Sequence, residues 1–74
     1  MAKKCLNDCC YNLVKQLAKK TQFLWNVDKY IKDASKAKDT ECARMWKQIR
    51  KDEEKHAEML KKHITKLAKQ GKFR

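Results

Sequence analysis

The stretch Lys36-Ala37-Lys38-Asp39-Thr40 divides the chain into two long halves that both have helical character. Asp39 or Thr40 can cap the start of a new helix, because a short oxygen-bearing side chain accepts a hydrogen bond from the free amides of the first turn. Glu41 follows, and its negative charge complements the positive end of the helix dipole. Two long helices joined by so short a connection run antiparallel as neighbours. This stretch therefore predicts a helical hairpin with its turn at about residues 36–40.

The first half of the chain carries one apolar stripe with the three- and four-residue steps of an amphipathic helix. We expect this helix over about residues 7–35, with Lys20 as the charged interruption of the stripe. Phe23, Trp25 and Tyr30 lie beside the stripe and widen it beyond what one partner helix covers, which predicts a second contact surface. The stripe consists of Leu6, Cys10, Leu13, Leu17, Leu24, Val27, Ile31 and Ala34.

The second half carries a similar stripe, and we expect its helix over about residues 41–70. Gly71 suits the left-handed conformation that often follows the last helical turn. Two polar residues, Glu53 and His56, interrupt this stripe. The stripe consists of Cys42, Met45, Trp46, Ile49, Glu53, His56, Leu60, Ile64 and Leu67.

The composition favours an all-α protein that associates with itself. The sequence has no Pro and one Gly, so it lacks the residues that strands and tight turns require. A chain of 74 residues is short for a complete apolar core, and such chains usually need metal, disulfides or a partner. We therefore predict an antiparallel two-helix hairpin that dimerises into a four-helix bundle, as a homodimer or a higher homo-oligomer.

The charge predicts an anionic partner. Lys and Arg number 20 against 9 Asp and Glu, which gives a net charge of +11. Nucleic acid, anionic lipid and an acidic protein all remain open, as does a solvated surface that keeps an oligomer in solution. Folding of the hairpin brings both chain ends to one pole, where basic residues gather. They are Lys3, Lys4, Lys61, Lys62, Lys66, Lys69, Lys72 and Arg74.

No segment has the length of a membrane span or the apolar core of a signal peptide, so we expect a cytoplasmic protein with reduced cysteines. Cys5, Cys9 and Cys10 form a cluster that could bind zinc, copper(I) or an iron–sulfur centre, with His63 as the nearest imidazole. Their spacing matches no zinc signature. The alternative is that Cys10 packs in the core and the other two are ordinary thiols.

Glu53 and His56 form the second candidate metal site. Side chains three residues apart on a helix project from one face, and a carboxylate with an imidazole suits iron, manganese or zinc. The alternative is an ion pair or hydrogen bond at a helix interface. The sequence shows no nucleophile constellation, phosphate-binding glycine loop or dinucleotide motif, so it gives no support to a hydrolase, kinase or dehydrogenase.

The segment Arg50-Lys51-Asp52-Glu53-Glu54-Lys55-His56-Ala57-Glu58-Met59-Leu60 resembles the second-helix signature of ferritin-like and rubrerythrin-like proteins. The segment Val27-Asp28-Lys29-Tyr30 loosely resembles the first helix of the short encapsulated ferritins. The resemblance implies a dimeric four-helix bundle that binds iron and oxidises iron or reduces peroxide. Among the family's metal-ligand positions, Glu53 and His56 are the two that match.

The sequence departs from this family because its first helix contains no Glu. In the predicted hairpin, the residue level with Glu53 is near Phe23, and Asp28 lies about one turn away as a possible third ligand. The leading hypothesis is an inter-subunit site for iron or another divalent metal at Glu53 and His56. The alternative hypothesis is a non-enzymatic oligomeric module whose basic pole binds an anionic partner such as nucleic acid.

Overall fold

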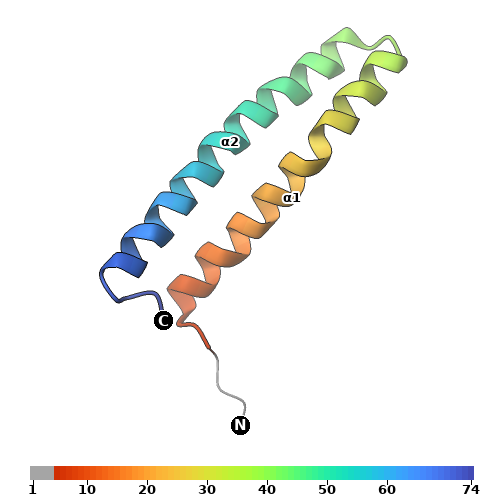
Figure 1. Cartoon of the computed structure of the whole chain (residues 1–74). Coiled ribbons are helices and arrows are strands. Elements are labelled where there is room, and N and C mark those ends of the chain that lie inside the picture. Colours follow the sequence, from red (N-terminus) through yellow and green to blue (C-terminus); the bar gives the residue numbers. More distant parts are fainter. Residues whose placement is uncertain (1–4) are drawn as a thin grey trace.

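A computed structural model describes residues 5–74 as two helices and no strand. Helix α1 (Asp8–Lys36) and helix α2 (Thr40–Lys69) run antiparallel side by side, with the start of α1 and the end of α2 at the same pole (Figure 1). The predicted all-helical hairpin is confirmed. The bounds of each helix differ by one residue from the expected ranges. In the described part of the chain, neither helix combines the length and apolar character needed to cross a bilayer.

Short polar side chains cap the start of both helices. Asn7 Oδ1 accepts a hydrogen bond from Cys10 N at 2.8 Å, and Asp39 Oδ1 accepts one from Cys42 N at 2.9 Å. Each bond satisfies an amide that has no partner within the first turn. Asp39, one of the two residues expected to cap the second helix, is therefore its N-cap.

Both helices end with a left-handed residue. Lys38 has φ 59° and Gly71 has φ 68°. The next amide bonds back to the last turn in each case: Asp39 N donates to Ala34 O at 3.0 Å, and Lys72 N to Leu67 O at 2.8 Å. Gly71 was expected in this role, whereas Lys38 was not, because the conformation costs a residue with a side chain about 1 kcal/mol.

Hydrogen bonds join the start of α1 to the segment that follows α2. Asn7 N donates to Arg74 O at 2.8 Å, and the Cys10 thiol donates to the Lys72 carbonyl at 3.5 Å. These contacts fix the segment after α2 against the start of α1.

The hairpin has little closed core. Its overall extents are 52 × 28 × 13 Å, so it is one layer of helix thick. Its radius of gyration is 16.5 Å, against about 11 Å for a compact domain of this length. Most large apolar residues on the facing stripes remain partly exposed on the broad sides of the layer. The fully buried residues in the described part of the chain are Cys10, Val27, Ala34 and Ala43.

Three aromatic side chains join the helices in the half of the hairpin nearest the turn. The ring centroids of Phe23, Tyr30 and Trp46 lie 5.1 to 6.2 Å apart, a range in which tilted and edge-to-face rings attract. Trp25, expected beside the same stripe, lies instead on the outer side of α1 and is 87% exposed. It lies two residues before the buried Val27, about 160° away around the helix.

Candidate functional site

A charged triad lies between the helices at mid-length. Glu53 Oε1 is 2.9 Å from His56 Nδ1, and Glu53 Oε2 is 3.2 Å from Lys20 Nζ. The Glu53 side chain is 18% exposed, the Lys20 side chain 29% and the His56 side chain 53%. Both carboxylate oxygens of Glu53 therefore already contact basic groups of the same chain.

One contact in this geometry was not predicted. The Lys20 ammonium reaches the Glu53 carboxylate from α1. The charged interruption of the first stripe and the acidic interruption of the second meet, because a half-buried carboxylate is stable only beside a compensating charge. Phe23 lies nearly one turn further along α1, where its ring packs against Trp46.

Asp28, expected as a possible third metal ligand beside Glu53 and His56, pairs with Arg50. Arg50 Nη1 donates to Asp28 Oδ1 at 2.8 Å, and Arg50 Nε lies 3.7 Å from Glu54 Oε1. This second charged cluster stands apart from Glu53 and His56. Within residues 5–74, no three His, Cys, Asp or Glu side chains gather in a way that could hold a metal ion. The described part of one chain therefore does not assemble a complete set of metal ligands.

The contacts of Glu53 determine its ionisation. The hydrogen bond from His56 lowers the pKa of the Glu53 carboxyl below its ordinary value of 4.5, and the Lys20 ammonium lowers this pKa further. Partial burial acts in the opposite direction and is outweighed. Glu53 is therefore an anion at neutral pH.

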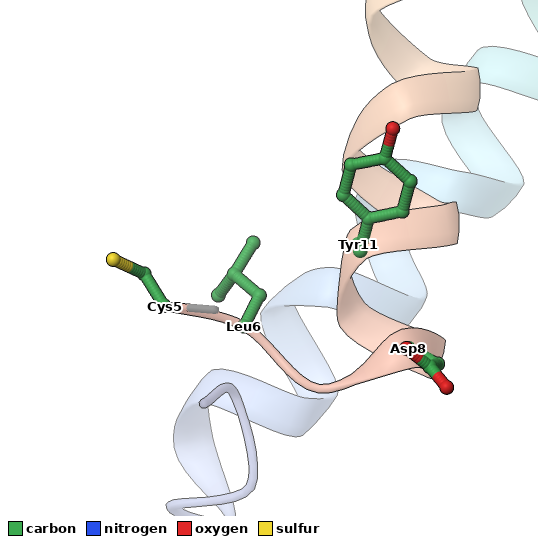
Figure 2. Close-up of a pocket in the computed structure, with 4 residues that line it drawn as sticks. All are labelled: Cys5, Leu6, Asp8 and Tyr11. Carbon is green, nitrogen blue, oxygen red and sulfur yellow. The ribbon is translucent and has the colours of Figure 1, made fainter. Parts of the chain in front are cut away.

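The cysteine cluster does not assemble as a site. Cys10 is buried, Cys5 and Cys9 are exposed, and all are free thiols. Cys5 lies on the segment before α1, where it lines a surface pocket with Leu6, Asp8 and Tyr11, and its sulfur points away from the helix (Figure 2). His63 lines a different hollow, beside Leu13 and Met59. The Cys10 thiol donates to the Lys72 carbonyl.

The outer surface of α2 carries a row of cations that sequence reasoning missed. The row follows three- and four-residue steps over about 38 Å of helix, and one position, Glu58, breaks it. All of its members are exposed, and none forms an ion pair within residues 5–74. The sequence contains the three- and four-residue spacing of these basic residues. The spacing can be recognised as one row only once the inward face of α2 is known. We call this row the cationic ridge: Arg44, Lys47, Lys51, Lys55, Lys62, Lys66 and Lys69.

Charge is also unequal along the length of the hairpin. Among the described residues, the half nearest the chain ends (5–22 and 56–74) holds nine Lys and Arg against Asp8 and Glu58. The half nearest the turn (23–55) holds nine against seven acidic residues. Positive charge is therefore concentrated toward the termini. Lys3 and Lys4, which belong to the predicted basic pole, lie outside the described residues.

Neither the family models, nor the curated proteins, nor the solved structures contain a match to this chain. The ferritin-like resemblance therefore stays a prediction, and the function has to be argued from the residues themselves.

The triad predicts a pH-dependent contribution to stability. Replacing Glu53→Gln should lower the free energy of unfolding by about 1 kcal/mol at pH 7. A carboxyl whose pKa is lowered by folding stabilises the fold above its unfolded-state pKa, and this stabilisation is lost as the pH falls through the folded-state value. The difference between the two proteins should therefore shrink below pH 4.5, the ordinary value. Urea unfolding at pH 7 and pH 3 measures this.

Glu58→Gln is the matched control, because Glu58 forms no ion pair within the described residues. A Glu53→Gln effect of equal size at both pH values, or one no larger than that of the control, would contradict the role of the triad.

Proposed function

We propose that this protein is a self-associating helical hairpin that binds nucleic acid through the cationic ridge of α2. The observation that carries the proposal is the ridge itself: seven exposed cations in a straight row, unpaired within residues 5–74. Cations left without local partners keep their full attraction for an external polyanion.

The dimensions of the ridge suit a phosphate backbone. A duplex carries one negative charge per about 1.7 Å of its axis, so a length of about 38 Å carries roughly twenty phosphates on its two strands. The ridge faces those on its own side of the duplex. Six of the seven residues are Lys, whose ammonium acts as a point charge toward phosphate and needs no fixed two-point geometry.

The same features favour nucleic acid over an acidic protein. The core of a protein interface is enriched in aromatic side chains and Met and depleted in Lys. The seven ridge positions carry no apolar side chain. Contacts to phosphate position a protein on the duplex but do not read bases. The proposal is accordingly a binding activity with little sequence preference, and it involves no catalysis.

The proposal includes self-association because a single hairpin leaves large apolar side chains of its core exposed to solvent. Its fully buried residues are small, and large apolar side chains such as Trp46 and Leu60 remain partly exposed in the described chain. A second hairpin would cover them and would present a second ridge, so that two ridges could engage one polyanion.

Binding to DNA should depend steeply on salt and on the ridge. The logarithm of the association constant should fall against the logarithm of salt concentration with a slope of about −5, because each phosphate neutralised contributes about −0.9. The double variant Lys51→Glu, Lys55→Glu should weaken binding at least about tenfold at low salt and reduce the slope by about 2. Fluorescence anisotropy with a labelled duplex of about 20 base pairs, longer than the ridge, measures both quantities.

The matched control is Lys29→Glu, Lys32→Glu, which makes the same charge change at exposed positions of α1. If both variants lost affinity and slope equally, binding would follow net charge and the ridge would have no special role. If wild-type binding were absent or insensitive to salt, the proposal would be wrong.

A second candidate function is divalent metal binding at His56, and the hydrogen bond between Glu53 and His56 Nδ1 favours it. A carboxylate at Nδ1 holds the imidazole so that Nε2 points outward as a ligand, an arrangement frequent around protein-bound metals. One chain does not supply enough ligands within residues 5–74, so the ion would be shared by two copies. Iron and zinc both suit imidazole.

Calorimetric titration with Zn²⁺ and with Fe²⁺ under anaerobic conditions tests this candidate. We expect about one ion per two chains, lost in His56→Ala and retained in His63→Ala, since shared imidazole ligation needs both copies. No binding by the wild type, or equal loss in both variants, would rule out the shared site.

A further inference from the structure

One broad side of the hairpin carries large apolar side chains in both of its halves. Near the turn it carries the aromatic cluster of Phe23, Tyr30 and Trp46. Toward the termini it carries a hollow in which Leu13, Met59 and Leu60 lie among the polar side chains of Gln16, Lys20, His56 and His63. We call this surface the methionine side, after its two most exposed apolar residues.

Met45 and Met59 mark the two ends of the methionine side on α2. They lie fourteen residues apart, a spacing that returns nearly to the same direction on a helix. Their exposed fractions are 47% and 67%, and their side chains are flexible enough to fill an uneven interface. The charged triad lies midway between them.

We propose that a second copy of the hairpin docks on the methionine side in antiparallel orientation, with the two-fold axis passing close to Glu53. This inference rests on the self-association in the proposed function. It adds the surface through which the two copies meet, their relative orientation and the register between them.

The exposed area supports a second copy as the occupant. The hairpin exposes 6307 Å², whereas a compact protein of its mass exposes about 4,800 Å². The excess is more than about 1,000 Å² per chain, and a stable interface of standard size needs about 800 Å² from each partner. Covering one broad side of each hairpin therefore provides enough buried surface for a stable pair.

The charge distribution selects the antiparallel orientation. A parallel pair would place the two terminal halves together, and each holds nine basic and two acidic residues among those described. An antiparallel pair places each terminal half against the turn half of its partner, which holds nine basic and seven acidic residues. The second arrangement reduces repulsion between like charges.

The triad fixes the register of this pair. Lys20, Glu53 and His56 lie at the centre of this surface, with the exposed Asp52 beside them on α2. A two-fold axis at this level brings the two triads together, so that each carboxylate gains the basic groups of the second copy as neighbours. Any slip would leave charged groups against apolar side chains, which is costly.

The register makes a direct prediction about the two methionines. Residue 52 is midway between Met45 and Met59, so the two-fold axis places Met45 of one copy against Met59 of the other. Within one chain the same two residues are about 21 Å apart along α2. A contact between them can arise only between copies.

A competing surface exists on the outer side of α1. Tyr11, Val14 and Trp25 follow the steps of a helix stripe and are exposed. Lys15 and Lys29 flank this stripe, and their like charges oppose the pairing of two such surfaces. The test therefore includes this surface as its control.

The decisive measurement is a methyl NOE spectrum of full-length protein labelled with ¹³C at the methionine methyl groups. We expect a cross-peak between the methyls of Met45 and Met59, which the intramolecular separation forbids. In parallel, sedimentation equilibrium should give a dimer for the wild type, a monomer for Met45→Glu, Met59→Glu, and a dimer for Val14→Glu, Trp25→Glu. Circular dichroism checks that the helices persist in both variants.

A monomeric wild type would overturn both this inference and the self-association in the proposed function, while leaving the ridge untouched. A dimer that lacks the Met45–Met59 cross-peak would overturn the inference alone. So would a dimer that dissociates in Val14→Glu, Trp25→Glu but survives in Met45→Glu, Met59→Glu. If the methionine variant failed to fold, the wild-type spectrum would still decide the question.

Discussion

The geometry of two helices in one layer governs the rest of this structure. Each helix can turn only a narrow strip toward the other, so the layer is 13 Å thick and the residues buried at its centre are small. The larger apolar side chains extend past the centre line onto the broad sides. Stability then depends on what joins the helices at those edges: the aromatic cluster in one half and the charged triad at mid-length.

The same geometry sorts the charges into two groups. Charges between the helices are compensated, as Glu53 is by Lys20 and His56, and as Asp28 is by Arg50. Charges on the outer side of α2 are not compensated within the described chain, and they form the cationic ridge. Partial burial favours the pairing of Glu53, whereas solvent permits the ridge cations to remain unpaired. The contacts that hold the hairpin together are therefore on the inner surfaces, and the surface proposed to bind nucleic acid is the outer side of α2.

Much of the fold followed from local chemistry. The cap at Asp39, the left-handed Gly71 and the two apolar stripes each depend on a few neighbouring residues, and sequence reasoning found them. The contact between Lys20 and Glu53 did not follow, because it depends on the direction in which the long Lys20 side chain packs between the helices. Lys38 was missed because a turn can impose a conformation that the residue itself disfavours.

The candidate site was harder to predict than the fold. Glu53 and His56 were correctly placed on one face, and their hydrogen bond is present, but their basic partner Lys20 was not foreseen. Asp28 was expected near them, yet a longer and better placed cation, Arg50, holds it. The ridge escaped notice because exposed Lys residues carry no periodic signal until the buried face of α2 is assigned.

The central claim is that one hairpin is an incomplete fold that a second copy completes. The dependence of the thermal unfolding midpoint on protein concentration tests this most directly, with circular dichroism as the probe. If folding and association are coupled, the midpoint should rise by several degrees for each tenfold increase in concentration, by mass action. A midpoint that stays constant from micromolar to millimolar protein would show that the single hairpin is stable by itself, and would contradict the account.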